Sequence, residues 1–195
     1  MTEQGVTSVV LVGVGGQGIL LGSEIIAEAA LLAGFEVKTN EVHGMAQRGG
    51  SVIAQIRYGR EVFGPLVPVG SAQVLASLEK IEALRFHRFL APDGVAVVSK
   101  QEIVPVTVSG GKATYPQDAD QRLERVFPRL LCVDALEIAE RLGSPRSANV
   151  VVLGALSGYL ALDNAIWEEA MRLRVKPQFL DVNLQAFSAG QELAR

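Results

Sequence analysis

The chain has 195 residues, which suits one domain with an appended helical piece. Its net charge of −3 and the absence of any run of Lys and Arg argue against nucleic acid as a partner. The longest apolar segment, 150–162, is too short and too interrupted to span a bilayer, and the first residues lack the basic and apolar regions of a signal peptide, so we expect a cytoplasmic protein that does not contact a membrane.

Short apolar runs alternate with amphipathic stretches through the first 143 residues. The predicted strands are 8–12, 35–41, 51–58, 73–77, 95–99, 103–108 and 130–133. The predicted helices are 17–33, 79–90, 119–126 and 135–142, and in the second of them the polar residues Lys80, Glu82, Arg85 and Arg88 are expected on the solvent side. Strands that alternate with helices predict an α/β fold, here a Rossmann-like three-layer sandwich with a largely parallel sheet.

The last quarter of the chain changes character and predicts a helical C-terminal segment. Residues 149–162 are apolar on all sides, with Gly154 and Gly158 one turn apart, a spacing that lets two helix backbones approach closely. Asp163 is the expected N-cap of the next helix, and Pro177 its expected end. We therefore expect one domain, with an α/β core over 1–143 and a helical extension over 144–195 that packs on this core or docks on a partner.

The strongest local motif is a glycine-rich turn between the first predicted strand and helix. It reads Gly13-Val-Gly15-Gly16-Gln17-Gly18 and matches the dinucleotide fingerprint G-x-G-x-x-G, whose turn leads into a helix N-terminus that can face a phosphate. The acidic residue that should hold a ribose is a loose fit at Glu41. A dinucleotide site, another phosphate or protein contact, and a tight turn without a ligand all stay open from this motif.

A second candidate segment follows the second predicted strand. His43 could transfer protons near neutral pH, and Arg48 could bind a phosphate or carboxylate because the adjacent Gly49 and Gly50 leave space around its guanidinium. Alternatively, both side chains are ordinary loop residues. The end of the second strand should lie at the same sheet edge as the first glycine turn, where doubly wound folds bind ligands.

No metal site is predicted. The single cysteine, Cys132, lies in an apolar run and is expected to be a buried structural thiol, and one thiol cannot by itself hold an iron–sulfur cluster or a zinc ion. The amides of Asn149 and Asn183 are expected to bind backbone groups within the protein.

Taken together, several segments resemble the γ subunit or γ domain of 2-oxoacid:ferredoxin oxidoreductases, the pyruvate and ketoisovalerate enzymes among them. They are the glycine turn at 13–18, Arg48-Gly49-Gly50, the apolar stretch 149–155 and the late segment 183–190. The segment 41–52 is most similar to the small subunit of the indolepyruvate branch. The resemblance extends over nearly the whole chain, and the combination of segments is more specific than any one of them.

The resemblance implies a function within a larger complex. Such enzymes decarboxylate a 2-oxoacid, here an aryl pyruvate such as indolepyruvate, form an acyl-CoA and reduce ferredoxin. Thiamine diphosphate, Mg²⁺ and iron–sulfur clusters would lie on a large α subunit, so this chain would bind no cofactor alone and CoA would be a co-substrate. The glycine turn, Gly49, Gly50 and Arg48 would then position CoA phosphates or the 2-oxoacid carboxylate.

Two other functions compete with this hypothesis. The chain could be a stand-alone Rossmann-type oxidoreductase that binds NAD(P) or a flavin, in which case the isolated chain would bind that cofactor. It could also be a purely structural subunit whose glycine turns serve only packing, in which case loop variants would leave activity unchanged.

Overall fold

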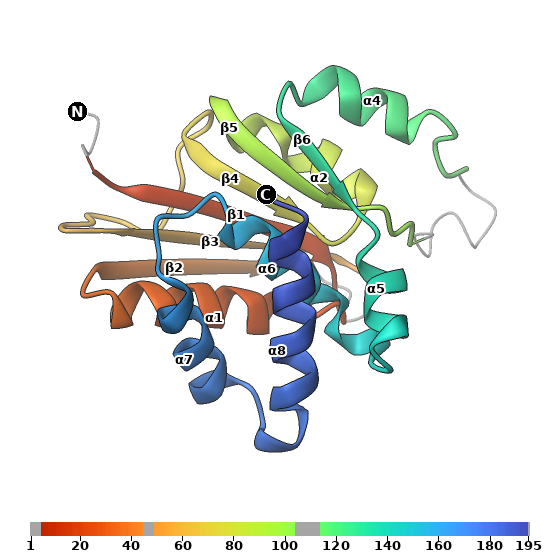
Figure 1. The fold of residues 1–195 in the computed structure, drawn as a ribbon. Helices are drawn as coiled ribbons and strands as arrows, with labels where there is room; N and C mark the ends of the chain where they lie inside the picture. Colours follow the sequence, from red (N-terminus) through yellow and green to blue (C-terminus); the bar gives the residue numbers. More distant parts are fainter. Residues whose placement is uncertain (1–4, 45–48, 104–113, 195) are drawn as a thin grey trace.

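The computed structural model describes residues 5–44, 49–103 and 114–194, and a six-stranded sheet of order β2-β3-β1-β4-β5-β6 forms its centre (Figure 1). The strands are β1 (Thr7–Val14), β2 (Glu36–His43), β3 (Ser51–Gly59), β4 (Ala72–Ser77), β5 (Leu90–Ser99) and β6 (Leu130–Val133). The helices are α1 (Ile19–Leu32), α2 (Lys80–Phe86), α4 (Ala119–Val126), α5 (Ala135–Arg141), α6 (Ala148–Ser157), α7 (Asn164–Arg174) and α8 (Pro177–Glu192), with the 3-10 turns η1 (His87–Phe89) and η2 (Pro145–Ser147).

The sheet is largely parallel, as predicted, with one reversed strand. Neighbours β1, β4, β5 and β6 run parallel, whereas β3 lies antiparallel to both β1 and β2. The chain between β2 and β3 is too short for the crossover connection that a parallel pair requires. As a result, β3 is inserted between β1 and β2, and β2 becomes the edge of the sheet.

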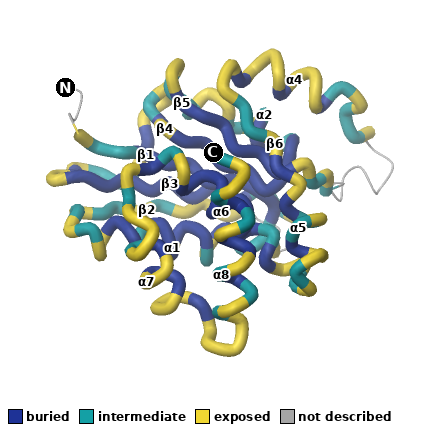
Figure 2. Tube along the Cα trace, viewed as in Figure 1, coloured by how far each residue is buried: buried dark blue, intermediate teal, exposed yellow. Residues whose placement is uncertain are grey.

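Helices cover both faces of the sheet, which confirms the predicted three-layer sandwich. Alternate residues of β1 belong to different hydrophobic clusters: Val9 and Leu11 pack with residues of α1, α6, α7 and α8, whereas Val10 and Val12 pack with residues of α2 and α4. This is the expected result of a strand whose side chains point alternately to opposite faces. Figure 2 shows the inner strands as almost fully buried, while β2 carries mostly exposed and intermediate residues.

The helices after residue 143 pack against the sheet and against one another. A Cβ atom built on Gly154 of α6 would lie 2.0 Å from the Phe187 carbonyl oxygen, and one on Gly190 of α8 would lie 2.0 Å from the Val151 carbonyl oxygen. The two backbones therefore touch where each helix has a glycine, which confirms the close approach predicted at Gly154. The atom nearest to a Cβ on Gly158 would be the Cβ of Ala194, at 2.7 Å.

Several local predictions are corrected by the structure. Pro177 is the first residue of α8 and not the end of α7, because proline is well suited to the first turn of a helix. Asp163 is the N-cap of α7, but its carboxylate makes no capping hydrogen bond. Cys132 is exposed, because β6 is an edge strand. Most of the predicted strand 103–108 lies outside the described residues.

Candidate functional site

The glycine turn joins β1 to α1 with little space for side chains. Gly16 and Gly18 have φ angles of +103° and +82°, which residues with a side chain rarely adopt. A Cβ on Gly13 would lie 2.8 Å from the Gln17 Oε1 atom, and one on Gly18 would lie 2.4 Å from the Asn149 Nδ2 atom. At Gly13 the requirement for glycine therefore comes from close packing, and at Gly18 close packing adds to the backbone requirement.

The second candidate segment meets this turn through the backbone. The Gly15 N–H donates to the Gly50 carbonyl oxygen at 2.8 Å, and the Gly49 N–H donates to the Gly15 carbonyl oxygen at 3.4 Å. The two glycine segments therefore lie together at the end of the sheet where β1 and β2 finish, as predicted. His43, the last residue of the outermost strand β2, is exposed at this end of the sheet, and Arg48 lies outside the described residues.

The side chain of Gln17 connects three strand ends. Its Oε1 atom accepts from the Val14 N–H at 2.7 Å, and its Nε2 atom donates to the Leu78 carbonyl oxygen at 2.7 Å and to the Gln101 Oε1 atom at 2.9 Å. Leu78 follows β4 and Gln101 follows β5. The amide therefore holds the glycine turn against the ends of the two neighbouring parallel strands.

A cavity of about 780 Å³ lies beside this turn. Its walls come from the glycine turn, the ends of β4 and β5, and the starts of the C-terminal helices; among the lining residues are Gly16, Gln17, Gly18, Gln101, Arg146, Asn149, Arg174 and Lys176. Arg174 pairs with Glu28 at 2.6 Å, whereas Arg146 and Lys176 form no ion pair within the described part of the chain. Two cationic side chains are thus available to a ligand in the cavity.

Three helices begin at this cavity. Gly18, Ser147 and Lys176 are the N-caps of α1, α6 and α8, and all three residues line it. None of these N-termini has a side-chain capping hydrogen bond or an acidic residue in its first turn. Because a helix N-terminus carries partial positive charge and unpaired N–H groups, the cavity is suited to an anion with several charged groups.

Hydrogen bonds hold the amide residues of the cavity wall. Asn149 Nδ2 donates to the Gly18 carbonyl oxygen at 3.1 Å, and Asn183 Nδ2 donates to the Phe179 carbonyl oxygen at 2.7 Å. Both amides bind backbone groups, as predicted. The bond from Asn149 ties the start of α6 to the start of α1, so two of the three helix N-termini are fixed relative to each other.

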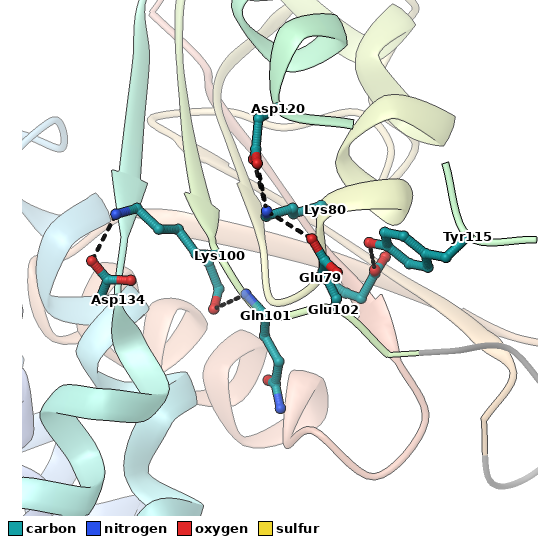
Figure 3. A network of polar contacts seen from close by, with 9 residues as sticks. Glu79, Lys80, Lys100, Gln101, Glu102, Tyr115, Asp120 and Asp134 are labelled. Atoms are coloured by element: carbon teal, nitrogen blue, oxygen red, sulfur yellow. Dashed lines mark hydrogen bonds and ion pairs between the residues drawn. The ribbon is translucent and has the colours of Figure 1, made fainter. Parts of the chain in front are cut away.

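A network of charged residues lies on the other side of the β4 and β5 ends (Figure 3). The carboxylate of Glu79, only 1% exposed, accepts from the Glu82 N–H at 2.9 Å and from the Tyr115 hydroxyl at 2.6 Å. Lys80 Nζ lies 2.9 Å from Glu102 and 2.7 Å from Asp120. Burial would lower the pKa of Lys80, but the hydrogen bonds that Lys80 donates to these two carboxylates outweigh burial and raise that pKa.

The prediction that Lys80 and Glu82 face solvent is therefore wrong. They are 6% and 5% exposed, because each has partners that satisfy its charge. Glu82 pairs with Arg85 at 3.0 Å and accepts a hydrogen bond from the Ser51 hydroxyl, next to the Gly49-Gly50 segment. Arg85 and Arg88 are exposed, as predicted.

Comparisons with known proteins identify the family. Residues 8–193 match the family model described as Pyruvate ferredoxin/flavodoxin oxidoreductase. The chain belongs to this family. The subunit IorB of indolepyruvate oxidoreductase from Archaeoglobus fulgidus is 45% identical over 96% of this chain and 94% of its own length, and the protein of the same name from Thermococcus kodakarensis is 41% identical over 96% of both.

The same unit also occurs inside longer chains of the family. The ketoisovalerate oxidoreductase subunit VorA of Methanothermobacter thermautotrophicus is 30% identical over 95% of this chain but only 36% of its own length. Among solved structures, 2-oxoglutarate:ferredoxin oxidoreductase from Magnetococcus marinus superposes on 98% of this chain and 31% of its own, with a TM-score of 0.73 and 22% identity. The γ subunit of a keto/oxoacid ferredoxin oxidoreductase from Geobacter sulfurreducens superposes on 96% of this chain and 98% of its own, with a TM-score of 0.71 and 23% identity.

Within this family member, the structure separates the predicted site residues into two groups. Gly16, Gln17 and Gly18 line the cavity, whereas Gly13, Gly15, Gly49, Gly50 and His43 do not. The cationic residues Arg146 and Lys176 and the amide of Gln101 are absent from the sequence predictions. A signal for the two cations existed, since each is next to a proline in the first turn of a helix.

Glu41, the acidic residue of the fingerprint, is engaged within the protein. The Glu41 carboxylate accepts from the Ser23 hydroxyl of α1 at 2.5 Å, so a partner inside the protein already binds it.

Within residues 5–44, 49–103 and 114–194, no group of three or more His, Cys, Asp and Glu side chains is arranged to hold a metal ion. None of the helices in these ranges is long and apolar enough to cross a membrane.

Proposed function

We propose that the chain is the small subunit of an indolepyruvate:ferredoxin oxidoreductase. The complex would decarboxylate an aryl pyruvate oxidatively, form the acyl-CoA and pass the electrons to ferredoxin. The observation that carries this proposal is the 45% identity with an IorB subunit over nearly the full length of both chains.

In this proposal the redox cofactors are on a large α subunit. Thiamine diphosphate, Mg²⁺ and the iron–sulfur clusters would be bound there, and ferredoxin would react with the complex. The composition of the chain supports this division, since its single cysteine cannot supply the set of thiolates that a cluster requires. The longer relatives support it as well, because in them a unit like this one is joined to additional polypeptide.

The cavity is the proposed site for the phosphates of CoA. A multiply charged ligand there would face the N-termini of α1, α6 and α8 together with Arg146 and Lys176. A bound phosphate would neutralise the positive charge of these groups, because none of the three helices has an acidic residue in its first turn to do so. The chain would thus hold the polar end of CoA, while the thiol end extends toward the active site of the large subunit.

The Gly49-Gly50 segment is the proposed contact with that active site. Gly49 and Gly50 hydrogen-bond to Gly15, and Arg48 directly precedes them in the chain. Arg48 would bind the 2-oxoacid carboxylate or a CoA phosphate, and His43 would assist proton transfer nearby. Arg48→Ala should then raise the KM for one of these substrates in an intact complex, whereas unchanged kinetics would remove Arg48 from the proposal.

The proposal is tested by purifying the tagged chain from its native cell without air. We expect a brown complex with a larger chain, which reduces a dye only when both indolepyruvate and CoA are supplied. If the chain is purified alone and colourless, the proposal is refuted. Titration with NAD(P) and flavins would then test the stand-alone alternative.

A further inference from the structure

The side chain of Gln17 has a hydrogen-bond polarity that its neighbours determine. Its Oε1 atom faces a backbone N–H, from Val14, which can only donate. Its Nε2 atom faces a backbone carbonyl, from Leu78, which can only accept. Rotating the amide by 180° would place donor against donor and acceptor against acceptor, so only one orientation is possible.

This orientation passes to the next amide. The second N–H of Gln17 donates to Gln101 at 2.9 Å, so the Gln101 atom at that contact must be the carbonyl oxygen Oε1. The NH₂ group of Gln101 therefore points away from Gln17. No hydrogen bond within the described residues uses this NH₂ group, and Gln101 lines the cavity. Figure 3 shows the Gln101 amide directed away from the Lys80 network.

We propose that Gln101 is a specificity-determining residue that donates a hydrogen bond to an oxygen atom of CoA in this cavity. The inference rests on the proposed function, since it assigns one contact within the same site. A serine hydroxyl such as that of Ser99, which also lines the cavity, can rotate to donate or accept. Gln101 cannot reverse its polarity without breaking its bond to Gln17, so it selects ligands that present an acceptor at this point.

Two substitutions at Gln101 test the direction of this bond in the whole complex. Gln101→Glu keeps an oxygen for Gln17 to donate to but presents a carboxylate to the ligand. Gln101→Met removes the donor without adding charge. We expect the KM for CoA to rise about tenfold for Gln101→Met, because the CoA oxygen loses its hydrogen-bond donor. We expect a rise of about a hundredfold for Gln101→Glu, because the new carboxylate would also repel a negatively charged oxygen of CoA. The KM for the 2-oxoacid should change much less.

Gln73→Glu is the matched control. The Gln73 Oε1 atom also accepts from a backbone N–H, that of Ser8 at 2.6 Å, and the substitution adds the same charge. Gln73 lies at the start of β4, whereas the cavity lies beyond the opposite end of that strand, so its variant should keep the wild-type KM for CoA. Melting temperatures of the three variant complexes verify that each is folded.

The results distinguish the two proposals. A wild-type complex that neither binds nor requires CoA would refute the proposed function, and the role of Gln101 with it. A wild-type complex that requires CoA, with both Gln101 variants retaining the wild-type KM for CoA, would refute the role of Gln101 alone. Equal rises for Gln101→Glu and Gln73→Glu would also refute it, since the effect would then reflect added charge anywhere on the chain.

Discussion

Gly18 is the residue at which the glycine turn, α1 and α6 meet. Its φ of +82° disfavours any side chain, and Asn149 occupies the space that a Cβ would need. Gly16 has a φ of +103° but no atom within 4 Å of a Cβ. The pair therefore separates two costs of replacing glycine in this turn, backbone strain and steric collision.

We expect Gly16→Ala to lower the free energy of unfolding by about 1 kcal/mol, from backbone strain alone. Gly18→Ala should lower it by about 3 kcal/mol, because the collision with Asn149 adds to the strain. Urea denaturation of the purified chain measures both values. Equal losses for the two variants would contradict the packing role assigned to Gly18.

Cys132 gives a prediction about reactivity. Its thiol is exposed, yet partial desolvation and the negative charge of Asp120 raise its pKa. A raised pKa leaves less thiolate at any given pH, so an alkylating reagent should label the folded chain more slowly than the urea-unfolded chain at pH 8. The difference should narrow as the pH rises. Because the chain has one cysteine, mass spectrometry reports this site alone; a folded chain that resists labelling until it unfolds would show a buried thiol instead.

At single positions, residue type was an incomplete guide to burial. Lys80 and Glu82 were expected in solvent because charged side chains are rarely buried without partners. Their partners Asp120 and Ser51 are 40 and 31 residues distant in the chain, so the local pattern contained no sign of them. Conversely, the apolar run around Cys132 predicted a buried strand, but only the sheet order shows that β6 is an edge.

At the scale of elements, the contact between α6 and α8 determines how the C-terminal helices pack. Gly154→Ala would place a methyl group against the Phe187 carbonyl, so the helices must separate. We expect a loss of about 3 kcal/mol in the free energy of unfolding despite the better helix propensity of alanine. Gly158→Ala, at the C-cap of α6, should cost less, since its methyl group would meet the Ala194 side chain at 2.7 Å and not a backbone carbonyl at 2.0 Å. Urea denaturation compares the two, and a stabilised Gly154→Ala variant would contradict this account of the contact.

The order of strands and helices was more accessible to prediction than their directions. The bounds of α4 and β6 agree with the predicted 119–126 and 130–133, because hydrophobic period and turn residues are local signals. The reversal of β3 was missed, although the short chain between β2 and β3 already required an antiparallel pair. The glycine turn was found because its motif is contiguous, whereas the cavity was not, because its walls come from segments that are far apart in the chain.

At the scale of the molecule, the cavity joins the α/β part to the C-terminal helices. Its wall combines the N-terminus of α1 with those of α6 and α8. The hydrogen bond from Asn149 to the Gly18 carbonyl oxygen joins the two parts directly. The three N-termini and the cations Arg146 and Lys176 repel one another while no anion lies between them. An anion in the cavity should therefore strengthen the association of the two parts.

This arrangement predicts that multivalent anions stabilise the folded chain. A ligand that binds only the folded state raises the free energy of unfolding by about 2.7 kcal/mol at a hundred times its Kd. Pyrophosphate and CoA should raise the melting temperature in a saturable way, whereas sodium chloride at matched ionic strength should not. Arg146→Glu and Lys176→Glu should each reduce this rise, while Arg60→Glu, an exposed position that does not line the cavity, should preserve it. If Arg60→Glu reduced the rise as much as the cavity variants do, the anions would be acting through net charge, and the convergence of the three helix N-termini would have no role in binding.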